Sequence, residues 1–257
     1  HLYYARYDGD QWHYETVDAS QAVGERASLA LDAAGKAHIS YRGIAKNGFP
    51  YLKYATNASG NWVTTTVDDL GSESSIALDA SGKVHICYQY YYENSYNYTQ
   101  GLKYTTNASG KWVTTVIAEA LSNTAAEGAS LALDTSGKAH VSYIYYDGSS
   151  HIVYATNASN KWVKTTLFSG NQIGYTALAL DASGNAHISH ANSYGRGLMY
   201  ITNASGKWVQ TMVDSGGRSG SLALDASGNA HISYPSSLGV KYATNASGVW
   251  VRTPLDN

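Results

Sequence analysis

One sequence pattern occurs five times along the chain, and this internal repeat constrains the fold more than any other feature. The first copy, SLALDAAGKAHISY, runs from Ser28 to Tyr41. Further copies begin at Ser75, Ser130, Thr176 and Ser221. A second pattern, LKYATNASGNW, lies between these copies and ends at Trp62, Trp112, Trp162, Trp208 and Trp250. A period of roughly 45 to 55 residues, made only of short strand-like runs, indicates a radial or linear repeat architecture.

Each full repeat contains four candidate strands. In the first repeat they cover residues 28–32, 37–41, 52–56 and 62–67. Short apolar runs bounded by Gly, Asn, Asp and Ser are typical of strands and hairpins. No segment keeps a 3.6-residue period, so we expect no long helix. Four antiparallel strands repeated radially predict an all-β protein made of β-propeller blades, with a linear β-solenoid as the alternative.

The first half of each repeat resembles a known propeller repeat. Each copy begins with an apolar run and an Asp, followed by two residues, a Gly and a second strand. This order is similar to the NHL-type repeat, in which the apolar run is the innermost strand. The combined pattern also looks like the tandem repeats of secreted bacterial propeller proteins, a class that includes polysaccharide lyases such as the ulvan lyases. The resemblance implies the fold more than the function, because propellers host many activities.

The strand count predicts five full blades and half of another in one domain, residues 1–257. The full blades begin near residues 28, 75, 130, 176 and 221. A sixth, worn copy within residues 1–20 supplies only two outer strands. We favour six blade positions, one of them incomplete, or a chain cut from a longer propeller. A five-blade ring with an appended hairpin is the alternative.

Composition excludes several classes of function. The net charge is −2 and 14% of the residues are charged, so no basic patch points to nucleic acid. A single cysteine, Cys87, excludes an intrachain disulfide. No apolar run reaches the roughly 18 residues that a membrane helix needs. The chain starts at His1, almost within a repeat, and shows no signal peptide, so we expect a mature or truncated form of a secreted or cell-surface protein.

The repeats differ from one another mainly at one end of each predicted blade. The turns between strands one and two, and between three and four, are nearly constant, as in Asp-Ala-Ser-Gly and Asn-Ala-Ser-Gly. The links between strands two and three vary, covering residues 42–51, 89–101 and 144–151 in the first three blades. The links between blades vary as well. Because variable loops on a constant scaffold usually carry function, we predict a binding site on this divergent-loop face.

The Tyr-rich segment 89–100 is the strongest candidate on the divergent-loop face. Aromatic rings with Glu, Asn and Gln match the apolar faces and hydroxyl edges that sugars present in alternation. The alternative is a strand extension whose tyrosines contact the neighbouring blade. The candidate ligand-binding residues are Tyr90, Tyr91, Tyr92, Glu93, Tyr96, Tyr98, Tyr145, Tyr146, Tyr194 and Arg196.

The repeated polar residues have structural explanations. Five equivalent histidines occupy second strands, at His38, His85, His140, His187 and His231. Ligands of one metal ion must all lie about 2 Å from it, which separate blades cannot achieve, so we expect hydrogen-bonding roles and no metal site. The aspartates that end each first strand are expected to accept bonds from turn amides. Turn chemistry likewise explains most Asn-x-Ser/Thr sequons, with glycosylation as the alternative.

Three functions are consistent with these features. The first is a lectin-like propeller without a cofactor that binds a glycan or polysaccharide, which the near-identity of the repeats favours over an enzyme. The second is a polysaccharide lyase or hydrolase, with catalytic candidates that depart from the repeat at His190, Tyr194 and Arg196. The third is a structural module that binds protein partners in an extracellular assembly through exposed blade edges.

Overall fold

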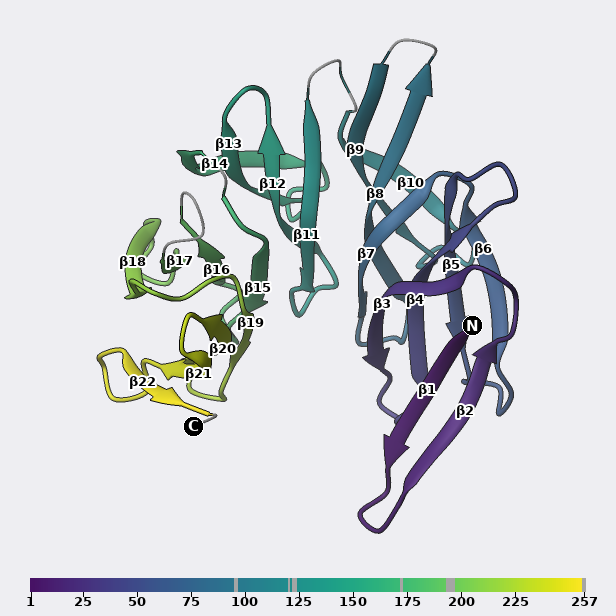
Figure 1. The fold of residues 1–257 in the computed structure, drawn as a ribbon, viewed down its shortest axis with the longest axis horizontal. Helices are drawn as coiled ribbons and strands as arrows, with labels where there is room; N and C mark the ends of the chain where they lie inside the picture. The colour runs from purple at the N-terminus through teal and green to yellow at the C-terminus, as the bar shows by residue number, and fades with distance from the viewer. Residues whose placement is uncertain (95–96, 120, 122–123, 172, 193–196, 256–257) are drawn as a thin grey trace. The chain divides into compact units, whose positions relative to one another are not determined.

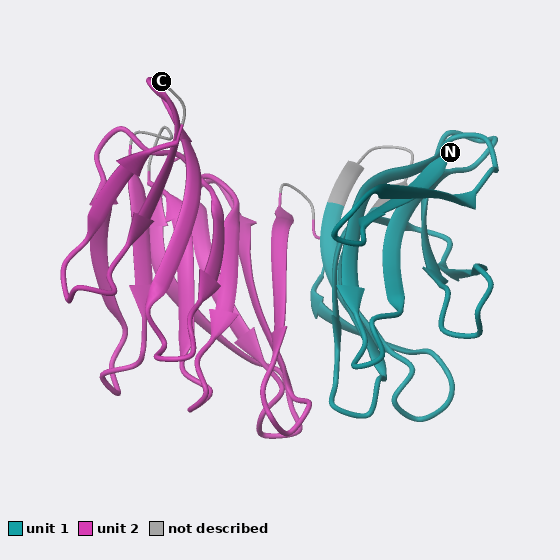
Figure 2. Cartoon of the chain, turned by 90° about the horizontal axis from the view of Figure 1, so that it is seen from below, with its two compact units in different colours: residues 1–120 teal, residues 121–257 magenta. Residues whose placement is uncertain are grey.

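The computed structural model describes residues 1–94, 97–119, 121, 124–171, 173–192 and 197–255, with backbone alone for 92–94 and 97–99. The chain divides into two compact units, His1–Ala120 and Leu121–Asn257 (Figure 2). That residues 1–257 form one domain stays a prediction.

Unit 1 contains one two-stranded and two four-stranded antiparallel sheets (Figure 1). The two-stranded sheet consists of β1 (Leu2–Tyr7) and β2 (Trp12–Asp18). The second sheet has the order β3 (Val23–Leu31), β4 (Ala37–Ile44), β5 (Pro50–Thr56) and β6 (Val63–Asp68). The third has the order β7 (Gly71–Leu78), β8 (Val84–Asn94), β9 (Asn97–Thr106) and β10 (Val113–Ala118).

Unit 2 contains three four-stranded antiparallel sheets, again with strands in chain order. The first holds β11 (Ala125–Leu133), β12 (Ala139–Tyr146), β13 (Ser150–Thr156) and β14 (Val163–Gly170). The second holds β15 (Thr176–Leu180), β16 (Ala186–Ala191), β17 (Leu198–Thr202) and β18 (Val209–Asp214). The third holds β19 (Ser221–Leu224), β20 (Ala230–Ser236), β21 (Gly239–Thr244) and β22 (Val251–Pro254).

The sheets confirm the predicted blades and the predicted half blade. The described residues form no helix, and therefore none that could span a membrane. In two of the full blades, the first strand begins at the predicted position, 176 or 221. In the other three full blades, the first strand begins several residues before the predicted positions 28, 75 and 130. A shift in register lets each of these strands keep pairing with the second strand beyond an irregularity. Sequence patterns do not reveal such bulges, which insert residues without breaking the strand.

The constant turns are held by their own side chains. Asp32 Oδ1 accepts hydrogen bonds from the backbone amides of Ala34 and Lys36, at 2.9 and 2.8 Å. Gly35 adopts φ 73°, which only glycine reaches at little cost. Asn57 Oδ1 accepts from the amide of Ala37 at 2.8 Å and joins the two turns of the blade. The other four full blades repeat these bonds, so the repeated Asp and Asn are parts of the framework.

A bulge near the end of β6 connects neighbouring sheets in unit 1. Leu52 pairs with Asp68 and Lys53 with Thr66, so Val67 has no partner of its own in the ladder. Asp68 then accepts hydrogen bonds from residues of the next sheet, the hydroxyl of Tyr88 at 2.7 Å and Nζ of Lys103 at 2.8 Å. We call this the Asp–Tyr–Lys trio. It recurs as Asp18, Tyr41 and Lys53, and as Asp214, Tyr234 and Lys241.

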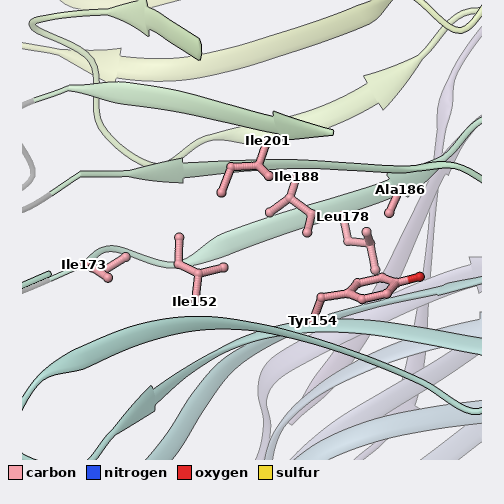
Figure 3. Packing of buried hydrophobic residues seen from close by; sticks show 7 residues of the cluster. All are labelled: Ile152, Tyr154, Ile173, Leu178, Ala186, Ile188 and Ile201. Atoms are coloured by element: carbon pink, nitrogen blue, oxygen red, sulfur yellow. The ribbon is translucent and has the colours of Figure 1, made fainter. Parts of the chain in front are cut away.

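Within each unit, the cores lie between consecutive sheets. In unit 2, Ile152 and Tyr154 of β13 form one cluster with Leu178, Ile188 and Ile201 of the next sheet (Figure 3). The repeated tryptophans complete these layers through edge-on contacts with a tyrosine of the preceding sheet. Their ring centroids are 5.1 to 5.5 Å apart. Such a pair contributes about 0.5 to 1.5 kcal/mol beyond the area that it buries. The pairs are Tyr4–Trp62, Tyr54–Trp112, Tyr154–Trp208 and Tyr200–Trp250.

Candidate functional site

The five repeated histidines are bonded inside their own blades. His85 Nδ1 lies 2.5 Å from the hydroxyl of Tyr104, and Nε2 lies 3.4 Å from Asp79 Oδ2. A carboxylate only accepts, so Nε2 carries the proton and Nδ1 accepts from the tyrosine. Burial lowers the pKa of His85, and Asp79 partly opposes that change. The other four histidines bond to the equivalent tyrosine, as the predicted structural role requires.

The described residues contain no group of three or more His, Cys, Asp or Glu side chains that could hold a metal ion. The histidines are each engaged in a separate sheet. The equivalent imidazoles are therefore features of the framework of each blade.

His190 lies in the core, which argues against its predicted role as a catalytic base. The side chain has no exposed surface, its Nδ1 lies 2.9 Å from the carbonyl oxygen of Ala191, and burial lowers its pKa to about 4. The ring lies 5.6 Å from that of Phe168. Along the repeat, Phe168, His190 and Met199 take the places of Asp68, Tyr88 and Lys103. His190 thus departs from the repeat because a more apolar set replaces the Asp–Tyr–Lys trio.

Several other predicted site residues lie outside the described part of the chain. Tyr96, Tyr194 and Arg196 are among them, as are the side chains of Tyr92, Glu93 and Tyr98. Their roles stay predictions. The backbone shows that segment 89–100 extends β8 and β9 into a long hairpin, in which Tyr92 pairs with Thr99 (Figure 1). This pairing is that of a strand extension, which was the alternative to a sugar-binding segment, and the contact of its tyrosines with the neighbouring blade stays a prediction.

A pocket opens on the divergent-loop face of unit 1. Its volume is about 340 Å³, which lies at the small end of the range for small-molecule sites. The β4–β5 link, Tyr51 of β5 and the β6–β7 link supply its lining residues. We call it the 45–70 pocket after its lining residues, Ala45, Asn47, Phe49, Tyr51, Asp69 and Leu70.

The link 42–51 was predicted to be variable, but no residue of the pocket was among the candidate ligand-binding residues. One signal was available, since Phe49 is one of only two phenylalanines in the chain. Residues of the 42–51 link line one pocket with Asp69 and Leu70, and this juxtaposition depends on strand register, which the repeat pattern did not provide.

Glycines fix two aromatic rings at this end of unit 1. Gly43 pairs with Tyr51 across β4 and β5, and a Cβ on Gly43 would lie 2.4 Å from Tyr51 Cζ. Gly101 pairs with Tyr90 across β8 and β9, and a Cβ there would lie 2.3 Å from Tyr90 Cε1. Each ring therefore lies directly on the backbone of the opposite strand. A ring placed in this way loses little side-chain freedom when a ligand binds.

Side-chain hydrogen bonds order the β8–β9 hairpin, and one backbone hydrogen bond joins the hairpin to the pocket. Gln89 Nε2 donates to Gln100 Oε1 at 2.6 Å, and the hydroxyl of Tyr91 donates to Gln89 Oε1 at 3.0 Å. The amide of Tyr91 donates to the carbonyl of Leu70, which lines the pocket. Tyr90 lies under Nζ of Lys103, 4.7 Å from its ring centroid. The backbone of predicted residue Tyr91 is thus bonded to a pocket residue, and predicted residue Tyr90 precedes it in β8.

The pocket retains free hydrogen-bonding groups. The carboxylate of Asp69 is exposed and makes no hydrogen bond or ion pair with the described residues. Asn47 uses Oδ1 for the amide of Phe49, at 3.2 Å, and its side-chain nitrogen has no partner among the residues described. An acceptor and a donor therefore stand beside Phe49 and Tyr51.

The remaining predicted tyrosines form a second group, on the divergent-loop face of unit 2. Tyr146 is 46% exposed at the end of β12. The half-buried ring of Tyr145 lies 6.4 Å from that of His151. The structure thus places Tyr90 and Tyr91 together in unit 1, and Tyr145 and Tyr146 together in unit 2.

Known structures resemble this chain in fold. A Hadza microbial sialidase, Hz136, matches with a TM-score of 0.62 and 9% identity over 93% of this chain, which spans 59% of the sialidase. An α-L-arabinanase of Penicillium chrysogenum, complexed with arabinobiose, matches with a TM-score of 0.62 and 13% identity over 95% of this chain and 85% of its own. The fold is that of a β-propeller.

A third match is an ulvan lyase of polysaccharide lyase family PL25. Its TM-score is 0.57, with 15% identity over 86% of this chain and 69% of the lyase. No protein-family model and no curated protein matches the sequence. At these identities the likeness shows the fold alone, the β-propeller of four-stranded blades that the repeat predicts.

Proposed function

We propose that the chain binds carbohydrate through the 45–70 pocket and the β8–β9 hairpin beside it. The observation that carries this proposal is the combination of two aromatic rings with unused polar groups in one pocket. Phe49 and Tyr51 offer apolar surfaces for the C–H face of a sugar ring. Asp69 and Asn47 offer an acceptor and a donor for its hydroxyl groups.

The bordering hairpin extends the proposed surface to more than one sugar unit. Tyr91 is held by Gln89, and Tyr90 by the absence of a side chain at Gly101. Rigid tyrosines give large contact area at low entropic cost, which suits recognition of a chain of sugars. The matched sialidase, arabinanase and lyase are named for activities on carbohydrates, which supports this class of ligand. A protein that binds polysaccharide is expected to be secreted or displayed at the cell surface.

A glycan array probed with the intact chain tests the proposal. We expect binding to a restricted set of glycans, and Tyr51→Ala should lose it because the sugar ring loses its platform. Tyr14→Ala is the matched control, since Tyr14 is 73% exposed in β2 and does not line the pocket. Equal binding by the wild type and Tyr51→Ala would contradict the proposed site.

A parallel assay separates binding from cleavage. The bound polysaccharide is incubated with the chain while new reducing ends and the absorbance of unsaturated uronic ends are followed. Binding without either product supports a lectin-like role. Turnover that depends on Tyr51 would instead make the pocket an active site.

A further inference from the structure

Three side chains form a hydrogen-bonded series on the divergent-loop face of unit 2. Ser169 Oγ lies 2.8 Å from His151 Nδ1, and His151 Nε2 lies 2.8 Å from Asp147 Oδ1. His151 and Ser169 face each other across β13 and β14, and Asp147 lies in the β12–β13 turn. The three residues come from one sheet, so their geometry depends on local pairing alone.

The direction of these hydrogen bonds follows from Asp147. Its bond from His151 holds the pKa of this carboxyl below the usual range, so it is ionised and only accepts. Nε2 of His151 must then carry the proton, which leaves Nδ1 as an acceptor. The hydroxyl of Ser169 is therefore the donor to Nδ1. A hydroxyl bonded to an imidazole that a carboxylate orients is the arrangement of an activated nucleophile.

The repeat does not require this series. His151 and Ser169 occupy the register positions that Tyr51 and Asp69 hold in the first full blade, where these two residues line the 45–70 pocket. Other blades carry Gly101 or Gly197 at the position of His151. The Ser–His–Asp series thus lies where the copies diverge, at the blade end already proposed for binding in unit 1.

We propose that Ser169 is a nucleophile toward carboxylic esters, with His151 as general base and Asp147 as the positioning residue. Ser169 Oγ attacks the ester carbonyl carbon while its proton passes to Nδ1 of His151. The tetrahedral adduct breaks its bond to the alcohol oxygen, which takes that proton and leaves as the alcohol. Water then attacks the acyl-serine, and its proton passes through Nδ1 back to Ser169, releasing the carboxylic acid.

The surroundings favour an ester carried on a ring-shaped alcohol, such as an acylated sugar. Tyr145 lies beside its cross-strand partner His151, so its ring can contact a ring next to the ester, and Tyr146 is 46% exposed at the adjacent position. The side chains of Asp147 and His151 are 50% and 21% exposed, which leaves the series accessible to a bulky substrate. General-base assistance alone contributes about 10²- to 10⁴-fold, and an exposed site is expected to lie at the lower end.

Acylation by p-nitrophenyl acetate tests the proposal. We expect an initial burst of nitrophenol, and mass spectrometry should find an acetyl group on the peptide that contains Ser169. Ser169→Ala should abolish both signals. Ser159→Ala is the matched control, because Ser159 is an exposed serine of the same unit that bonds only to a turn carbonyl. It should acylate like the wild type.

Asp147 provides a second readout. Asp147→Asn should slow acylation at least tenfold, whereas Asp147→Glu should retain more activity, because it restores the carboxylate. Circular dichroism checks that each variant is folded. Absence of an acetyl group on Ser169 in the folded wild type, or equal bursts from the wild type and Ser169→Ala, would overturn the proposal. Loss of glycan binding at Tyr51 would leave these results unchanged, so the two proposals fail separately.

Discussion

At the scale of single residues, the Asp–Tyr–Lys trio shows how the chain joins its sheets. Asp68 accepts bonds from both Tyr88 and Lys103, and each of the three side chains is largely buried. Removal of one partner from a buried ion pair leaves the other charge uncompensated. In one copy Phe168 replaces the aspartate of the trio, and in the same set Met199 replaces the lysine. The members are therefore expected to behave as one energetic unit.

The first prediction concerns this coupling. Asp68→Phe alone should lower the free energy of unfolding by about 3 kcal/mol, because the ammonium of Lys103 stays buried without its partner. The triple change Asp68→Phe, Tyr88→His and Lys103→Met, which copies the set at His190, should cost less than the single change. Urea unfolding followed by fluorescence measures both. A triple variant less stable than Asp68→Phe would refute the coupling.

The second prediction concerns acid stability and His190. Burial lowers the pKa of His190 to about 4, against 6.5 for the free side chain. Below pH 6.5 the unfolded chain therefore binds a proton that the folded chain does not, so stability falls from pH 6.5 to 4. The loss from this residue is on the order of 3 kcal/mol at or below pH 4. His190→Phe should show a shallower decline in urea unfolding between these pH values, and an unchanged slope would contradict the burial effect.

At the scale of elements, the repeat predicted the strands and turns well. The apolar runs, the Asp32 and Asn57 turns and Gly35 are local features, and local features can be read from a repeated sequence. Two other features depend on how the strands pair. They are the bulge at Val67 and the register that places Tyr51 opposite Gly43. The pocket results from that pairing, and so it could not be predicted.

The third prediction tests the placement of the Tyr51 ring. Gly43→Ala would put a Cβ 2.4 Å from Tyr51 Cζ, so the ring must move away from the β4 backbone. We expect glycan affinity to fall about tenfold, or ~1.4 kcal/mol, although every ligand-contacting side chain is retained. Gly216→Ala is the control, since its added Cβ would meet no atom nearer than 3.7 Å. Calorimetric titration of both variants decides this, and unchanged affinity in Gly43→Ala would contradict the preorganised ring.

At the scale of the whole molecule, repetition divides the chain into a constant framework and a variable face. The constant turns hold the blades, and the 45–70 pocket and the Ser169 series both lie on divergent-loop faces. The comparison of the repeats with one another predicted this division. Two kinds of difference look alike in such a comparison. His190 differs from its counterparts in the other copies because the buried side chains around it differ, whereas other residues differ at the surface.

The fourth prediction uses the only cysteine as a probe of unit 1. Cys87 is completely buried in β8, and burial raises the pKa of its thiol. The thiolate is the reactive form, so a disulfide reagent such as DTNB should not modify the native chain. One thiol per chain should react in urea, with the same midpoint as unfolding. Rapid modification of the native chain would show that the β8 core opens readily.

Isothermal titration with the glycan that binds best on the array measures whether the 45–70 pocket binds carbohydrate. We expect one site per chain for the wild type, at least tenfold weaker binding by Tyr51→Ala, and unchanged binding by Tyr14→Ala. Identical dissociation constants for the wild type and Tyr51→Ala would contradict it.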